Sequence, residues 1–124
     1  MDSSLPLWRR SLAEGLAAFT LVFAGCGAVV ANARYDETLG TVGVGIVFGL
    51  VIMVMVYATG HLSGAHINPA VTTAFAITRH LPRRDAVTYI TAQLSGAALG
   101  ALLLLAVWPN QPAQLGATLP SVGQ

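Results

Sequence analysis

The stretch SGAHINPAVTTAFA, Ser63 to Ala76, decides the fold of this chain. It lies within residues 38–78, a run of 41 residues that contains no Asp, Glu, Lys or Arg. About 20 apolar residues cross a bilayer as one helix. The run is therefore too long for one span, and a glycine, a histidine and an Asn-Pro pair interrupt it before a second span can be completed.

The composition indicates a membrane protein with a single domain over residues 1–124. The chain is 55% hydrophobic and only 9% charged, with a mean hydropathy of +0.70. Soluble domains carry about 25% charged residues. The net charge of +1 and the absence of lysine give no indication of nucleic-acid binding. The single cysteine, Cys26, excludes a disulfide within the chain and predicts a small apolar packing residue.

Charge-free stretches predict three spanning helices, at about residues 8–33, 38–60 and 86–108. A cleaved signal peptide is the alternative for the first, because Arg9 and Arg10 precede it and Ala31-Asn32-Ala33 resembles a cleavage site. Signal cores are usually 7–15 residues long. The first stretch is longer, which favours an uncleaved span.

The arginines predict the orientation of a multi-pass protein in the cell membrane. Arg34 alone lies between the first two spans; the other five are Arg9, Arg10, Arg79, Arg83 and Arg84. The positive-inside bias makes the end with five arginines cytoplasmic. We therefore expect a cytoplasmic N-terminus and a C-terminal tail outside. Aromatic residues near the span borders are expected at the headgroup level, namely Trp8, Tyr35, Tyr89 and Trp108.

Residues 61–78 predict a re-entrant loop followed by a half-helix. Gly60 and Gly64 weaken the second span, and Pro69 disfavours helix at Asn68. Asn68 is a good N-cap and Pro69 suits the first helical position, so a helix of about nine residues starts here and crosses half a bilayer. An interfacial helix over residues 70–77 is the alternative, although its threonines give little of the basic face typical of such helices.

Non-helical backbone at membrane depth is tolerated only against protein or a water-filled cavity. The break therefore predicts a polar pathway, in which the carbonyls of Gly64, Ala65 and His66 accept hydrogen bonds from a solute. The Asn68 amide donates one while its oxygen caps the half-helix. The positive end of the half-helix dipole repels cations.

SGAHINPAVT (63–72) resembles the first signature loop of the major intrinsic protein family, the aquaporins and aquaglyceroporins. AEGLAAFTLVFAGCGAVV (13–30), FGLVIMVMVYATGH (48–61) and YITAQLSGAALGALL (89–103) resemble the family's first three helices. The resemblance covers roughly residues 8–121, which is half of a family member. It implies an all-α membrane protein with three spanning helices and one half-helix, half of a six-helix inverted-repeat bundle.

The resemblance also implies roles for single residues. Asn68, Pro69 and Ala70 match the signature, and Gly64, Ala65 and His66 match the pore-lining carbonyls before it. Phe48 matches an aromatic position of the outer constriction, where it narrows a pore. Glu14 and Gln93 match buried polar residues that brace the loop. Without the resemblance, Phe48 reads as a core aromatic, and Glu14 as the partner of Arg10 four residues earlier.

The function expected from the resemblance is passive passage of water or small neutral solutes such as glycerol. AFAITRHLP (74–82) resembles the bacterial, nodulin-related branch, whose members pass glycerol or uncharged metalloid acids. No cofactor, metal site or enzyme activity is expected, and His61 and His66 have the wrong spacing for a metal pair on one helix face. The partners expected are the bilayer, the solute, and either a complementary C-terminal half or further copies of the chain.

Two other classes of function stay open at this point. The first is a non-conducting truncated fragment or membrane interaction protein, which a missing second Asn-Pro-Ala signature favours. The second is a small secondary-transporter subunit, because such proteins also use broken helices. A transporter depends on an ion gradient, whereas a channel does not.

Overall fold

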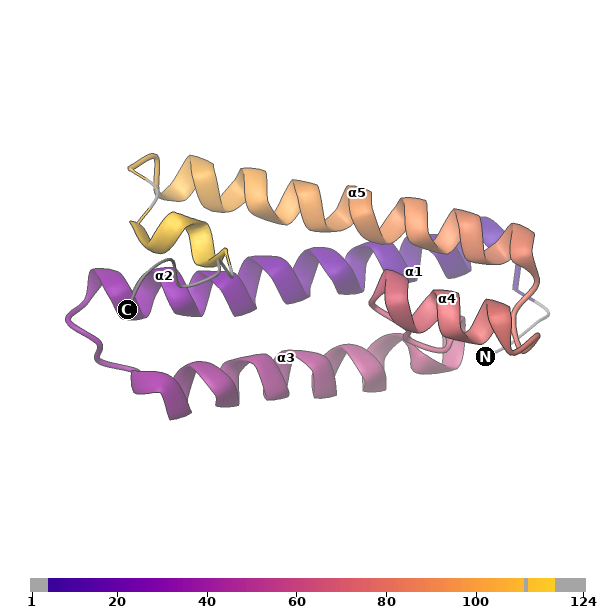
Figure 1. Cartoon of the computed structure of the whole chain (residues 1–124), viewed down its shortest axis with the longest axis horizontal. Helices are drawn as coiled ribbons and strands as arrows, with labels where there is room; N and C mark the ends of the chain where they lie inside the picture. Colours follow the sequence, from indigo (N-terminus) through magenta and orange to yellow (C-terminus); the bar gives the residue numbers. More distant parts are fainter. Residues whose placement is uncertain (1–4, 111, 118–124) are drawn as a thin grey trace.

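The computed structural model describes residues 5–110 and 112–117, and within them every regular element is a helix, with no β-strand. Two long helical segments, α1–α2 and α5, lie along each other, with the long helix α3 on one side and the short helix α4 beside one end (Figure 1). Three helices are long and apolar enough to cross a membrane: residues 7–34, 40–63 and 83–107. This confirms the expected all-α membrane fold with three spans.

The first span consists of three helical segments without a break. They are α1 (Leu7–Thr20), a π-helical stretch η1 (Leu21–Cys26) and α2 (Gly27–Arg34). No pattern in the sequence predicts the π-helical stretch. Near its end, Gly25 gives room to the Phe48 ring, because a Cβ at this position would lie 2.3 Å from the ring.

The second span, α3 (Gly40–Ser63), continues three residues past Gly60, where the sequence reading ended it. A single glycine costs a helix only about 1 kcal/mol, so Gly60 alone does not stop it. The helix ends at Gly64, whose φ of 94° is left-handed and whose N–H donates to the Gly60 carbonyl at 3.0 Å. Glycine adopts this conformation without a steric penalty.

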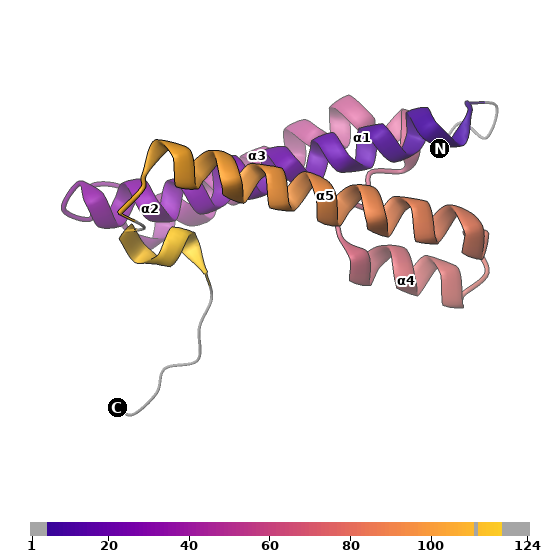
Figure 2. The same cartoon turned by 90° about the horizontal axis from the view of Figure 1, so that it is seen from above.

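The half-helix α4 (Pro69–Ile77) and the third span α5 (Arg83–Val107) follow, and a short 3-10 segment η2 (Pro112–Gly116) lies beyond them. After Ser63 the chain turns back toward the middle of the bundle, and α4 then runs to the end where the N-terminus lies (Figure 1). Viewed from above, α4 lies alongside the first half of α5 (Figure 2).

Close packing of α1 on α5 depends on two glycines of α5. A Cβ at Gly96 would lie 2.0 Å from the Gly15 carbonyl oxygen, and one at Gly100 would lie 2.9 Å from that of Phe19. Glycine therefore lets the two backbones touch. Gly45 and Gly49 of α3 have the same spacing, but a Cβ at either would meet nothing within 4 Å. Their face of α3 is open in this chain.

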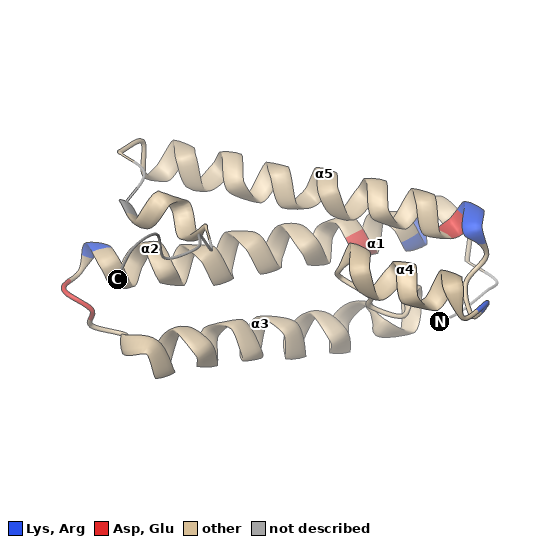
Figure 3. Ribbon diagram, in the orientation of Figure 1, with Lys and Arg blue, Asp and Glu red and all other residues tan. Residues whose placement is uncertain are grey.

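Most charged residues lie toward the two ends of the bundle (Figure 3). Five arginines lie at the end that holds the start of α1 and the α4–α5 turn, and Arg34 lies at the other end beside Asp36 and Glu37. Glu14 is the exception, since it lies within α1 and is fully buried.

Candidate functional site

The backbone between α3 and α4 adopts an irregular, left-handed path. Gly64, Ala65 and Ile67 have φ values of 94°, 48° and 57°. Non-glycine residues at positive φ are strained and persist only where the surroundings hold them. Ala65 and Ile67 pack with Ala17, Leu21, Val51 and Met55, so α1 and α3 hold the loop from one side.

Glu14 of α1 binds this loop directly. Its Oε1 accepts hydrogen bonds from Ser63 Oγ (2.6 Å) and the His66 N–H (2.9 Å), and its Oε2 accepts from the Ile67 N–H (2.7 Å). The carboxyl group is fully buried at 0% exposure. Arg10 pairs with Asp85 of α5 at 2.6 Å. The geometry thus ties Glu14 to the loop, rather than to the arginine four residues earlier.

Gln93 of α5 joins Glu14 to the half-helix. Its Nε2 donates to Glu14 Oε2 and to Thr72 Oγ1, both at 2.9 Å. Thr72 Oγ1 also lies 3.1 Å from His66 Nδ1. All four side chains are buried. The network therefore links α1, the loop, α4 and α5 through polar groups that have little access to solvent.

Tyr89, Ser63 and Thr72 are the residues of this network that the sequence reading missed. Tyr89 was expected at the membrane border, and that expectation is wrong: the residue is 0% exposed and its hydroxyl donates to the Ser63 carbonyl at 3.0 Å. Its ring lies edge-on to His66, with centroids 5.5 Å apart. The sequence feature that indicates this role is the position of Tyr89, which precedes Gln93 by one helical turn and therefore lies on the same face of α5.

Hydrogen bonding in the loop leaves one side of the backbone available. The N–H groups of Gly64, Ala65, His66 and Ile67 all donate, to Gly60, Ser63 and Glu14. Within residues 5–110 and 112–117, the carbonyls of residues 64–67 accept from no protein donor. The protein thus satisfies the N–H donors of the loop. Among the described residues, the loop carbonyl oxygens remain available to accept hydrogen bonds from a bound molecule.

The half-helix begins as its sequence predicts. Asn68 has extended backbone, its Oδ1 accepts from the Ala70 N–H at 2.7 Å, and Pro69 is the first helical residue. Asn68 and Ala70 are exposed, and Pro69 is half-buried. The capped, positive end of the helix dipole therefore lies next to the free carbonyls.

Phe48 lies apart from this site. It is half-buried on α3, with its ring against Gly25 of the π-helical stretch. Fifteen residues separate it from Ser63 on the same helix, which is about 22 Å along the axis. The structure thus brings together eight of the nine residues that the sequence singles out, with Glu14 and Gln93 at their centre. It leaves Phe48 nearer the opposite end of the bundle. In the described part of the chain, no group of three His, Cys, Asp or Glu side chains is placed to hold a metal ion.

Comparison with known proteins gives this arrangement a family. The model of the family described as major intrinsic protein matches residues 1–123. The chain belongs to the major intrinsic protein family. Members of this family are channels, and the apolar helices described above make this one a multi-pass membrane protein.

Plant proteins are among the similar relatives. Aquaporin NIP1-1 of Oryza sativa subsp. japonica is 45% identical over 118 residues, which is 95% of this chain and 42% of the relative. Putative aquaporin NIP4-1 of Arabidopsis thaliana is 42% identical over 115 residues, 93% of this chain and 41% of the relative. Nodulin-26 of Glycine max is 40% identical over 118 residues, 95% of this chain and 44% of the relative. The chain spans less than half the length of these relatives.

Proposed function

We propose that this chain forms one half of an aquaporin-type pore for water and small neutral solutes such as glycerol. The observation that carries the proposal is the loop of residues 64–68. Its N–H groups are bound by the protein, while its carbonyls have no protein donor in the described residues and lead to the capped end of α4.

The chemistry of this surface suits a small neutral hydrogen-bonding solute. A row of carbonyl oxygens accepts from water or an alcohol, and the Asn68 Nδ2 group donates to it. The positive end of the α4 dipole opposes cations. The buried hydrogen bonds of Glu14 and Gln93 fix the loop in its strained conformation, so the acceptors are already in position before a solute arrives.

The complete pore in this proposal contains a second half that enters from the opposite face of the membrane. A complementary C-terminal half is the partner we favour, and further copies of the chain are the other candidate. The arginine-rich end is cytoplasmic in this proposal, because five of the six arginines lie there. A non-conducting interaction protein remains the second candidate, since the described residues hold one half-helix that starts inside the bundle.

The test is permeability of proteoliposomes that contain this chain together with the C-terminal half of a similar family member. Stopped-flow light scattering then measures water and glycerol flux. We expect permeability well above empty liposomes and a clear reduction by Asn68→Ala. Asn110→Ala, an exposed asparagine beyond α5, is the matched control and leaves the flux unchanged. Flux that is equal with and without Asn68 contradicts the proposed path, and no flux at all favours the non-conducting alternative.

A further inference from the structure

Thr72 lies near the end of a hydrogen-bond relay that starts at Glu14. Gln93 Nε2 donates to Glu14 Oε2 and to Thr72 Oγ1, both at 2.9 Å, and Thr72 Oγ1 lies 3.1 Å from His66 Nδ1. The side chains of Glu14, Gln93 and Thr72 are at most 1% exposed. Neither bulk water nor a further chain packed around the bundle can therefore supply a partner to these three side chains.

Two backbone N–H groups set the direction of the relay. The N–H of His66 donates to Glu14 Oε1 at 2.9 Å and that of Ile67 to Oε2 at 2.7 Å, and a backbone N–H can only donate. An ionised Glu14 accepts these bonds, and those from Ser63 and Gln93, without a proton of its own. The Gln93 amide must then turn its NH₂ group toward Glu14, because its oxygen would face another acceptor.

The hydroxyl proton of Thr72 follows from this direction. Because Gln93 Nε2 only donates, Thr72 Oγ1 accepts from it and keeps its own proton for another partner. Within the described residues, the other side-chain atom in hydrogen-bond contact with Thr72 Oγ1 is His66 Nδ1. Thr72 thus donates to Nδ1, which must be unprotonated. A proton on Nδ1 would leave the buried Thr72 proton without an acceptor, which is costly.

We propose that Thr72 is a positioning residue for the loop, which fixes His66 as the neutral imidazole with its proton on Nε2. The hydrogen bond that one ring nitrogen makes decides which nitrogen carries the proton. A stack on Phe75, with centroids 4.6 Å apart, and the edge contact with Tyr89 hold the ring in the same place. The ring then adds no positive charge to the loop. The proposal concerns protons inside this chain and holds whether or not the proposed pore conducts.

His80 offers a contrasting contact in the same chain. Its Nδ1 lies 3.0 Å from Thr78 Oγ1, but that hydroxyl already donates to the Ala74 carbonyl at 2.8 Å. The contact therefore forms with His80 Nδ1 as the donor. Two contacts between histidine and threonine of similar length are thus expected to have opposite polarity, because the threonine proton is used differently in each.

Nitrogen NMR of a chain with a single histidine tests the proposal. The sequence holds three histidines, so His61→Gln combined with His80→Gln leaves His66 alone, and His61→Gln by itself adds the His80 signals for comparison. The chain is labelled with nitrogen-15 histidine, purified in detergent and measured at neutral pH, where protonated and unprotonated ring nitrogens have separate shifts. We expect an unprotonated Nδ1 and a protonated Nε2 for His66, and more proton on Nδ1 for His80.

Two outcomes of this measurement overturn the proposal. The first is a His66 with its proton on Nδ1, which is the reverse relay and requires a proton on Glu14 and a turned Gln93 amide. The second is a His66 with both nitrogens protonated. Neither outcome depends on flux, so the proposed function and this proposal can fail separately.

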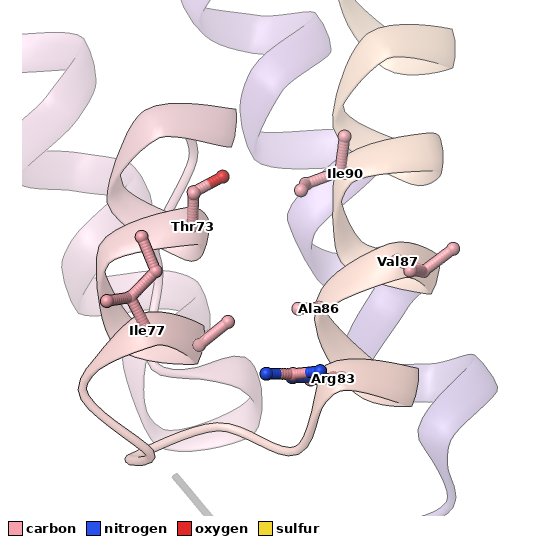
Figure 4. A pocket seen from close by; sticks show the side chains of 7 residues that line it. Thr73, Ile77, Arg83, Ala86, Val87 and Ile90 are labelled. Carbon is pink, nitrogen blue, oxygen red and sulfur yellow. The ribbon is translucent and has the colours of Figure 1, made fainter.

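Variants of Thr72 separate proton placement from packing. Thr72→Val keeps the shape without the hydroxyl and is expected to shift the His66 Nδ1 signal, whereas Thr72→Ser keeps the hydroxyl and preserves it. Thr73→Val is the matched control, because the Thr73 hydroxyl donates to the Pro69 carbonyl at 2.7 Å and its side chain lines a pocket between α4 and α5 (Figure 4). Equal shifts from Thr72→Val and Thr73→Val, or a shifted signal in Thr72→Ser, overturn the role of the hydroxyl. Circular dichroism checks the helices, and if Thr72→Val does not fold, the Thr72→Ser and single-histidine measurements decide.

Discussion

Glu14 is the residue on which the loop depends most directly. Each of its carboxyl oxygens accepts two hydrogen bonds, from two backbone N–H groups and from Ser63 and Gln93. Backbone N–H groups buried without a partner cost about 1–3 kcal/mol each. A single side chain thus satisfies the N–H groups of His66 and Ile67, which have no regular secondary structure to do so.

We expect Glu14→Gln to destabilise the chain by about 1–3 kcal/mol or more, because an NH₂ group then replaces one acceptor oxygen and faces buried donors. Thermal unfolding in detergent, followed by circular dichroism, measures the change. Glu37→Gln, in the exposed turn before α3, is the control and stays within about 0.5 kcal/mol. A melting temperature for Glu14→Gln equal to that of the control would show that the loop is held by apolar packing alone.

Asn68 is expected to act on stability through its cap. Its Oδ1 accepts from the Ala70 N–H, and loss of an N-cap oxygen costs about 0.5–2 kcal/mol. Asn68→Ala is therefore expected to lower the unfolding temperature, whereas Asn68→Asp keeps the cap oxygen and most of the stability. The same thermal unfolding assay measures both variants. Equal losses for Ala and Asp would contradict the cap as the cause.

At the scale of elements, contact between α1 and α5 sets the width of the bundle. Gly96→Ala places a methyl group 2.0 Å from the Gly15 carbonyl oxygen, so the helices must separate. Overpacking of this kind costs about 1–3 kcal/mol. Gly45→Ala is the matched control: it lies within α3, a Cβ meets nothing within 4 Å, and alanine favours helix.

We therefore expect Gly96→Ala to lower the thermal stability of the purified chain and Gly45→Ala to leave it unchanged or slightly raised. The unfolding temperatures of the two variants are compared in one detergent. If both variants lower stability equally, then glycine at position 96 has no special packing role. The comparison separates close helix contact from general helix propensity.

The elements themselves were largely accessible from the sequence. Lack of charge over long stretches predicts the spans, and Asn-Pro after two glycines predicts a half-helix whose cap the structure shows at Asn68. The sequence predicts the end of α3 three residues too early. The low helix propensity of glycine indicates a stop at Gly60, whereas the helix continues to Ser63, whose hydroxyl donates a hydrogen bond to Glu14. No local pattern in the sequence predicts the π-helical stretch, which packs against both α3 and α5.

The sequence predicts the site residues less completely than it predicts the helices. Glu14 and Gln93 are singled out through their resemblance to buried polar residues of the family, whereas the sequence alone also allows Glu14 to pair with Arg10. Tyr89 carries an apolar ring with a hydroxyl group. Its position near the end of a span is therefore compatible both with the membrane–water interface and with a buried site where the hydroxyl has a hydrogen-bond partner. The hydrogen bonds of this network join residues up to 79 positions apart in the sequence, and no local pattern specifies such pairs.

At the scale of the whole molecule, charge distribution predicts which end faces the cytoplasm. In a Cys26→Ala background, we expect Gln114→Cys to react with a membrane-impermeant maleimide added outside intact cells. His80→Cys, in the exposed turn between α4 and α5, is expected to react only after the membrane is permeabilised. Labelling with the opposite pattern would show that the arginine-rich end faces outward and that the positive-inside bias does not determine the orientation of this chain.

We expect the 124-residue chain to form no open pore by itself. A half-helix that starts inside the bundle and ends at the arginine-rich end supplies polar backbone for one side of a membrane-spanning path (Figures 1 and 3). The other side needs a half-helix that enters from the opposite face, which a second copy supplies only by inserting upside down. Five arginines at one end against one at the other oppose that insertion, because arginine-rich ends stay cytoplasmic. Copies in a common orientation would place both half-helices on the same side and leave the remaining path unformed.

We therefore expect liposomes that hold the purified chain alone to show water permeability close to that of empty liposomes in stopped-flow light scattering, and addition of a complementary half to raise it. Fast shrinkage with the chain alone, abolished by Asn68→Ala and retained by Asn110→Ala, would show instead that two copies insert in opposite orientations and that the arginine bias is too weak to prevent it.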